Sequence, residues 1–464
     1  MRTAKTLLAA VALMASLSTP AADLLEVWRA ASQNDPEAAM AQAQKATADA
    51  RRIQAKALWR PGLEVLGSAG RMNASSAVNG ASFAAPGFGQ SNGVSFATSV
   101  SNGNTTSWGL GLRQPLISGE LSARSDQLLQ GAGAAEWQSQ ITRQALILNT
   151  SQRYFDVVLC AQRLNLLRRQ QHAVMRSLTE AEDRFKLGDA PVTDIHEAQA
   201  RAKALKAQVI DADNALQLAM SALQEASGLP SLSLPLAQPA ADVLSPLPGN
   251  EEEVRVLALR NYPALELLQT RVAVAEAEVR GLGAGASASL DLVAQATRQH
   301  LTGSGDFGPA SNDSRQQMIG LQFRMPIDTG GRNARQREAL LAVDQARAAL
   351  EQGRLQVGQQ IRSVWLALDK AQERLQALAA ALSAANSRLD ATRLGRSVGD
   401  RTTLDLLNAE NDRTAAALLL IQGRVEVLQN SLRLDALLGR LDESSLARIN
   451  AKLVQGPDLQ QMGE

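Results

Sequence analysis

The sequence predicts a mostly α-helical chain built from two similar halves, each of which carries two amphipathic strands. Three observations support this fold class: a long internal repeat, very long helical runs without proline, and short segments in which apolar and polar residues alternate. Aromatic residues make up only 3% of the 464 residues, which is low for one globular core. The 47 lysines and arginines nearly balance the 46 aspartates and glutamates, which argues against a nucleic-acid partner.

Residues 1–22 have the layout of a secretory signal peptide. Arg2 and Lys5 precede an apolar run, and small residues follow it. We expect cleavage near Ala21 or Ala22, and therefore an exported protein. No later stretch approaches the roughly 18 apolar residues of a membrane-spanning helix.

Two Gly-Asp turns mark the internal repeat. Gly188-Asp189 and Gly399-Asp400 lie 211 residues apart, and each precedes a helical pattern. The segments 109–115 and 320–326 are similar at the same spacing. Motifs near the start of each half are instead 227 residues apart, so the first half holds 16 extra residues between its strands. An insertion of this kind is what a surface loop tolerates.

The first half, residues 23–228, begins with a helical segment that the Asp35-Pro36 pair interrupts. Its further elements follow from the hydrophobic periods, and we expect strands at about 62–77 and 96–117 and long helices at 119–187 and 191–228. A linker with five prolines, residues 229–249, joins the halves and cannot be helical.

The second half, residues 250–443, repeats this order. We expect strands at about 286–300 and 314–327, and long helices at 331–398 and 402–440. The remaining residues, 444–464, are expected to form a C-terminal tail.

The long helices need partners along their whole length. At a rise of 1.5 Å per residue, a run of about 68 residues spans about 100 Å. Apolar residues recur at steps of seven, for example at Ile147, Tyr154 and Ala161, which is the spacing of a coiled-coil seam. An ordinary soluble coiled coil has the same spacing, so this pattern alone does not identify the architecture. At the far ends of these helices, Gly188 and Gly399 suit tight turns because glycine accepts a positive φ, and we expect the two turns to lie side by side.

The strand segments alternate between apolar and polar residues. Trp108, Leu110 and Leu112 point to one side, and the residues from Ile319 to Ile327 follow the same rule. Period-two segments of about ten residues are typical of membrane β-barrels, and equally of a half-buried soluble sheet. Four strands cannot close a barrel, because known barrels of this kind begin at about eight strands, and an open edge is not tolerated in lipid. The chain therefore oligomerises, to eight strands as a dimer or twelve as a trimer, or these segments are not membrane strands.

Several short segments, taken together and in order, resemble the TolC-type outer membrane efflux and secretion proteins. The resemblance covers nearly the whole chain after the signal segment, and it rests on Asp23–Trp28, Asn34–Glu37, Arg113–Gly119, Phe185–Asp194 and Val398–Asp405.

This resemblance implies a mixed architecture: a membrane β-barrel continued by a long α-helical barrel. The family forms a homotrimer with a 12-strand barrel in the outer membrane of a Gram-negative-type bacterium and a periplasmic helical tunnel. The resemblance further implies that the protein is a passive conduit embedded in outer-membrane lipid. Its implied partners are a periplasmic adaptor protein and an inner-membrane transporter of the ABC or proton-driven class. The segment from Phe185 to Asp194 looks closest to members that serve type I protein secretion.

The resemblance also implies a charged gate at the periplasmic end. By position, its residues here are Thr193, Asp194, Arg396, Arg401, Asp405 and Asn408. Asp405 matches an acidic ring that faces the pore, whereas a second ring falls on the uncharged Asn408. The family's aromatic gate partner falls on Arg396, so an Arg396–Asp194 ion pair is expected in its place. The alternative is that Asp405 and Asp194 are solvated residues near helix N-termini, where negative charge is favoured.

The sequence shows no pattern of a catalytic, cofactor or metal site. The residues that could carry such chemistry are isolated from one another: Cys160, His172, His196 and His300. We therefore expect no enzyme activity and no cofactor. The rival to the conduit is a periplasmic coiled-coil structural or adaptor protein without membrane strands.

Overall fold

The computed structural model describes residues 23–87, 89–188, 191–229, 237–284, 288–305, 308–326 and 331–455. The predicted signal peptide and Asp189 lie outside these residues. The chain divides into two compact units, the first comprising Met1–Thr47, Ala134–Gln269 and Ala348–Glu464, and the second Ala48–Gly133 and Thr270–Arg347. Each unit contains segments from both halves of the repeat, so the halves intertwine and do not fold as separate compact bodies.

The helices of the first half are α1 (Leu24–Asn34), α2 (Pro36–Ala57), α3 (Gly119–Lys186) and α4 (Val192–Ser227). Those of the second half are α5 (Glu251–Asn261), α6 (Pro263–Ala284), α7 (Arg332–Asp369), α8 (Ala371–Ser397), α9 (Thr403–Leu437) and α10 (Glu443–Asn450). The strands are β1 (Gly62–Ala85), β2 (Gly89–Ser118), β3 (Ala237–Pro239), β4 (Ser289–Gly305), β5 (Gly308–Arg324) and β6 (Leu453–Gln455). Among the described residues, no helix has an apolar stretch long enough to cross a membrane.

Local chemistry fixes where the shorter helices begin. The Asp23 carboxylate accepts a hydrogen bond from the Glu26 N–H at 2.8 Å and so caps α1. At α5, the Asn250 side chain accepts from the Glu253 N–H, and the Glu253 carboxylate accepts from the Asn250 N–H. The predicted break at Asp35-Pro36 separates α1 from α2.

The helix expected over residues 331–398 is interrupted once. The backbone leaves helical geometry at Lys370, with φ −88° and ψ 0°, and this separates α7 from α8. The Lys370 N–H still donates to the Leu366 carbonyl, and its own carbonyl accepts from the Arg374 N–H, so the hydrogen-bond ladder continues across the break. The sequence did not predict it, because no proline or glycine marks the position, and the preceding Asp369, a residue type common at helix N-termini, was not recognised as a signal.

The C-terminal segment is not a simple tail. Asp442 caps α10 by accepting from the Ser445 N–H at 3.0 Å, and β6 then pairs antiparallel with β3 of the proline-rich linker. The Lys452 ammonium donates to the carbonyl oxygens of Val243 and Leu244, which also belong to the linker. These contacts join residues more than 200 positions apart, which local sequence patterns do not reveal.

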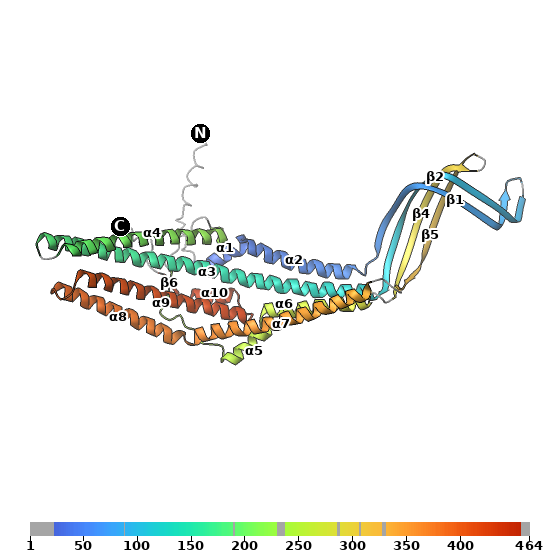
Figure 1. Cartoon of the computed structure of the whole chain (residues 1–464). Helices are drawn as coiled ribbons and strands as arrows, with labels where there is room; N and C mark the ends of the chain where they lie inside the picture. Colours follow the sequence, from blue (N-terminus) through green and yellow to red (C-terminus); the bar gives the residue numbers. More distant parts are fainter. Residues whose placement is uncertain are drawn as a thin grey trace, which may run out of the picture. The chain divides into compact units, whose positions relative to one another are not determined.

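The second unit contains a four-stranded antiparallel sheet in the order β1-β2-β4-β5. Figure 1 shows these strands as one strongly curved sheet. The strands are longer than predicted: β1 and β2 continue to a tight connection, with Ala85 opposite Gly89. The sequence suggested a surface loop over residues 73–104, because Ser, Asn and Gly are common there. Most of the described residues of this segment pair across the β1–β2 hairpin, which the extra residues of the first half lengthen.

The register of the sheet places apolar side chains on one face. Directly opposite residues share a face, and one row across the four strands contains Leu63, Leu112, Ala294 and Ile319. Many of these side chains are exposed, Ile319 to 76%. The opposite face is polar and includes an ion pair between Arg113 Nη2 and Asp291 Oδ2 at 2.7 Å. The predicted period-two alternation is confirmed.

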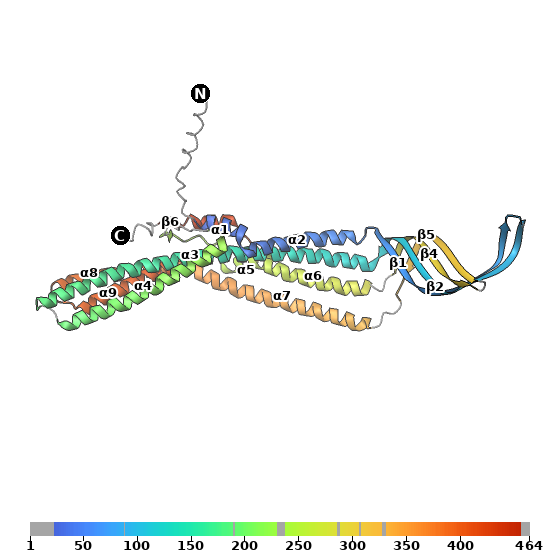
Figure 2. The same cartoon turned by 90° about the horizontal axis from the view of Figure 1, so that it is seen from above.

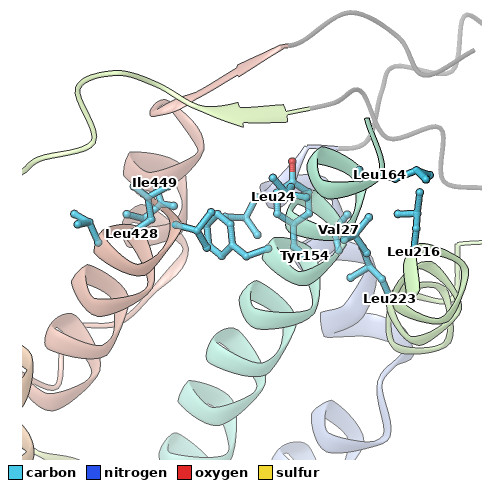
Figure 3. Packing of buried hydrophobic residues seen from close by; sticks show 14 of the residues in the cluster. Leu24, Val27, Tyr154, Leu164, Leu216, Leu223, Leu428 and Ile449 are labelled. Atoms are coloured by element: carbon cyan, nitrogen blue, oxygen red, sulfur yellow. The ribbon is translucent and has the colours of Figure 1, made fainter. Parts of the chain in front are cut away.

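The core of the first unit lies where several helices meet. Figure 3 shows α1, α3, α4, α9 and α10 contributing apolar side chains to one cluster, among them Leu24, Val27, Tyr154, Leu164, Leu216, Leu223, Leu428 and Ile449. The rings of Tyr154 and Phe155 pack edge to face with centroids 5.9 Å apart. Burial raises the pKa of the Tyr154 hydroxyl well above its usual value. The α1 segment is thus anchored to the long helices.

Candidate functional site

The two Gly-Asp turns have the same backbone conformation. Gly188 has φ +82° and Gly399 has φ +85°, and a Cβ atom at either position would meet no other atom within 4 Å. Backbone conformation, and not space, therefore selects glycine at both turns. The Gly188 N–H donates to the Phe185 carbonyl, and the Gly399 N–H donates to the Arg396 carbonyl. The Asp400 N–H closes the second turn on Gly395 at 2.8 Å, whereas Asp189 lies outside the described residues.

The helices on either side of these turns form two pairs. Figures 1 and 2 show α3 beside α4 and α8 beside α9. Within the second pair, arginines of α8 bind carboxylates of α9 at 2.6 Å in three successive places: Arg374–Glu426, Arg388–Asp412 and Arg393–Glu410. In the first pair, Arg168 of α3 binds Asp213 of α4 at 3.0 Å. Each pair is therefore held together by its own polar contacts as well as by its apolar seam.

Asp405 stands in the first turn of α9 and forms a capping box with Thr402. Its Oδ2 accepts hydrogen bonds from the Thr402 N–H at 3.0 Å and from the Thr402 hydroxyl at 2.9 Å. The Asp405 N–H donates in return to the Thr402 hydroxyl at 3.1 Å. The hydrogen bonds from the Thr402 backbone and hydroxyl, followed by the charges of Arg401 and Arg388, lower the pKa of Asp405. The carboxylate is thus held ionised at the end of a helix.

Asp194 connects the two helical pairs near the turns. Its Oδ2 accepts a hydrogen bond of 2.8 Å from the hydroxyl of Thr403, which is almost fully buried. Asp194 lies in the first turn of α4 and Thr403 begins α9, so this contact ties the return helix of one pair to that of the other.

Arg396 has a different partner from the one that we expected. Its Nη1 lies 3.2 Å from Glu180 Oε2 on α3, while Asp194 binds Thr403, so the expected Arg396–Asp194 ion pair is wrong. The reason is the position of the groups along the helices. Arg396 and Glu180 both precede their turns, on α8 and α3, whereas Asp194 follows its turn on α4. The structure therefore contains two links between the pairs, one on the outgoing helices and one on the returning helices.

The surroundings of Arg396 are unusual for a charged group. Its side chain is only 6% exposed, and its Nε and Nη2 are buried with no hydrogen-bond partner among the residues that the structure describes. Beside it lies a cavity of about 440 Å³ between α3, α8 and α9, lined by Ala173, Arg176, Ser177, Glu180, Arg393, Arg396, Ser397, Leu406 and Glu410. A buried guanidinium group with a single partner is an incompletely satisfied charge.

The other predicted site residues lie on the surface. Thr193, Arg401 and Asn408 are exposed, and Asn408 follows Asp405 by three positions, so both lie on one side of α9. Sequence reasoning missed Glu180 and Thr402, and it identified Thr403 only as a residue that could assist capping, not as the donor to Asp194. The Thr402–Asp405 spacing matches a capping box and could have been read from the sequence. Nothing in the sequence marks Glu180, because its role depends on the approach of a distant helix.

The described residues contain no group of three or more histidine, cysteine, aspartate or glutamate side chains placed to hold a metal ion. What the turn region offers is a set of charged and hydrogen-bonding side chains that connect helices. Such an arrangement can hold the helix ends together and set the local charge.

Comparison with known proteins adds to this geometry. The family model described as "Outer membrane efflux protein" matches residues 27–229 and 254–440. The outer membrane protein TolC of Escherichia coli (strain K12) is 30% identical over 378 residues, which cover 78% of this chain and 75% of that protein. The proteases secretion protein PrtF of Dickeya chrysanthemi is 27% identical over 361 residues, covering 76% of this chain and 77% of that protein.

Solved structures share the fold at lower identity. The outer membrane protein VceC of Vibrio cholerae aligns with a TM-score of 0.70 at 18% identity, over 90% of this chain and 96% of that chain. The open state of the MtrE outer membrane channel of Neisseria gonorrhoeae aligns with a TM-score of 0.68 at 19% identity, over 91% and 90% of the two chains. The curved sheet and the long helices described above are thus found in outer membrane channels.

Proposed function

This chain belongs to the outer membrane efflux protein family, and from that premise we propose how its parts form an outer-membrane exit duct. The protein is an outer membrane channel of the efflux and secretion type, resembling proteins such as TolC, PrtF and VceC. In our proposal it acts as a passive conduit from the periplasm to the exterior, without catalytic activity or a cofactor.

The main support for the proposal is the amphipathic sheet, whose two edge strands have no outer partner among the described residues. Strands β1 and β5 are the outer strands of a four-stranded sheet whose one face is an exposed apolar surface. In lipid, the free N–H and C=O groups of these edges would cost several kcal/mol each. Pairing β1 of one copy with β5 of the next removes both edges, and three copies supply the twelve strands of a closed wall. The apolar face would then contact lipid and the polar face would line the lumen.

The experiment is to determine both the location and the oligomeric state. The mature protein should fractionate with the outer membrane and run as a heat-modifiable species. In nanodiscs its mass should equal that of three protomers. A monomer that remains in the aqueous periplasmic fraction would overturn the proposal and would favour a periplasmic structural rod or adaptor.

The helix turns are proposed to form the periplasmic gate. Asp405 would supply a ring of three carboxylates around the pore, and Asn408 would supply a polar ring without charge. Thr193, Asp194, Arg396 and Arg401 would connect the helices at the constriction, with Gly188, Asp189, Gly399 and Asp400 forming the tips. Support comes from the two observed links, Arg396–Glu180 and Asp194–Thr403, which join separate helical pairs close to both turns.

The partners are proposed from the family. A periplasmic adaptor and an inner-membrane transporter, of the ABC or proton-driven class, would recruit the conduit into a tripartite assembly. The names of two relatives, the proteases secretion protein PrtF and the alkaline protease secretion protein AprF, support secretion of protein cargo, whereas BepC is named an efflux protein. Crosslinking in the native envelope followed by purification would identify the transporter and so decide between these cargo classes.

A further inference from the structure

The geometry around Arg396 points to a site for a small oxyanion, and we propose that the cavity between α3, α8 and α9 binds a carboxylate or phosphate ligand. The cavity of about 440 Å³ is large enough for such a group and several water molecules. This site would exist whether or not the turns act as a gate, so the inference goes beyond the proposed channel function.

The shape of the guanidinium group is the first argument. Nε and Nη2 lie on one edge of the planar group, and their two N–H bonds form the fork that binds two oxygens of a carboxylate or phosphate. In Arg396 neither of these nitrogens has a hydrogen-bond partner in the described part of the chain, while Nη1 lies 3.2 Å from Glu180 Oε2. The unused edge is therefore the one suited to an oxyanion. Both nitrogens are buried away from water, although the Arg396 side chain lines the cavity. We therefore expect the guanidinium group to rotate so that these two nitrogens face the cavity when the ligand binds.

The charge of the cavity is the second argument. Three arginines and two glutamates line it, which leaves one positive charge in excess. Both glutamates already have cations, since Glu180 binds Arg396 and Glu410 binds Arg393. Arg176, on the α3 wall, is exposed and has no ion pair with any residue that the structure describes. A cation would meet arginines on two walls, whereas an anion would find Arg176 and Arg396 available.

The structure of the Arg396–Glu180 pair is the third argument. Glu180 is 54% exposed, and its one ion pair with a described residue is 3.2 Å long, so water already competes for its carboxylate. A ligand that binds the fork with two oxygens would satisfy two buried N–H groups that the present arrangement leaves without partners. Ligand binding would therefore compete with Glu180 for Arg396 and weaken the link between α8 and α3.

The test is a binding measurement on the full-length mature protein in detergent. Inorganic phosphate and acetate are titrated by calorimetry at constant ionic strength, with chloride as the reference anion. We expect saturable binding of phosphate, acetate or both, and the stronger of the two defines the preferred ligand geometry. In Arg396→Gln the affinity should fall about tenfold or more, since hydrogen bonds to charged groups contribute at least that factor.

The matched control is Arg388→Gln. Arg388 lies on the same helix and binds Asp412, but it does not line the cavity, so this variant should bind like the wild type. Absence of saturable binding in the wild type, or equal affinity in Arg396→Gln, overturns the proposal. If Arg396→Gln does not assemble, the binding measurement is made on Arg176→Gln instead. An affinity for phosphate and acetate unchanged from the wild type in that variant also overturns the proposed anion site. Because no current is measured, failure of the site is distinct from failure of the channel.

Discussion

At the residue scale, the charged groups near the turns divide into two kinds. Asp405 is hydrogen bonded within its own helix end, and the hydrogen bonds from Thr402 are the largest cause of its lowered pKa, ahead of the charges of Arg401 and Arg388. Arg396, Glu180, Asp194 and Thr403 instead connect helices that are far apart in the sequence. A functional role for Asp405 therefore has to be separated experimentally from its role as a cap.

Replacement of Asp405 tests that role. Asp405→Ala should raise the single-channel conductance in planar bilayers and reduce the preference for cations, because it removes three negative charges from the proposed constriction. Asp405→Asn is the second variant, since it removes the charge and keeps side-chain oxygen for the Thr402 N–H. Asp412→Ala, a carboxylate on the same helix, is the control. Unchanged currents in both Asp405 variants would contradict the assignment.

The effect of pH on this cap has a defined sign. The folded-state pKa of Asp405 is lowered, so the ionised cap stabilises the helix end above the carboxyl's unfolded pKa of about 3.9. That contribution is lost as the pH falls from there through the lower folded-state value. Cation preference should therefore be constant near neutral pH and decline only in strongly acidic solution.

At the element scale, glycine conformation determines how the long helices reverse. Both turns need a positive φ, and the sequence predicted this correctly from the repeated Gly-Asp pairs. The break at Lys370 and the helix α10 were not predictable in the same way. The first lacks proline or glycine, and the second, although Asp442 caps it locally, also packs against α1, which lies far away in the chain. Local patterns specify elements whose causes are local, and Glu180 was missed for the same reason.

Gly399→Ala tests the turn. The alanine Cβ would meet no atom, but the positive φ should cost roughly 1–2 kcal/mol at this position. We expect a lower thermal midpoint and faster proteolysis at the turn. Gly358→Ala in α7 is the matched control, because its Cβ would also meet no atom within 4 Å and its backbone is helical. The control should be neutral or stabilising by up to about 1 kcal/mol. Equal behaviour of the two variants would contradict the conformational argument.

At the scale of the whole molecule, the sheet is the part that the sequence described least completely. Alternation gave the correct faces and the number of strands in the sheet, but not the length of β1 and β2. The pairing of β2 with β4 ends at Ser101 opposite Ser304, so the outer part of the β1–β2 hairpin pairs with no other strand that the structure describes. Its composition, rich in Ser, Asn and Gly, is also typical of a surface loop. Only the register of paired residues shows that this segment is a hairpin.

Shortening this hairpin tests whether its outer part belongs to the wall. Deletion of residues 75–98, with a two-residue turn in their place, should leave outer-membrane assembly and conductance unchanged, because no strand other than β1 and β2 pairs there among the described residues. The comparison is a deletion of equal length within residues 62–72 and 103–115, which removes rows that span all four strands. Loss of assembly in the first variant would show that neighbouring copies rely on the projecting hairpin.

The contacts near Asp23 and Asn450 impose an order on biogenesis. Asn450 donates to the Asp23 carboxylate and accepts from the Leu24 N–H, and β6 completes its pairing with the linker only a few residues later. A copy still emerging from the translocation machinery cannot form this clasp, because residues 450–455 have not yet arrived. The first helix is therefore held in place only after complete export, and a prematurely terminated copy would lack this clasp.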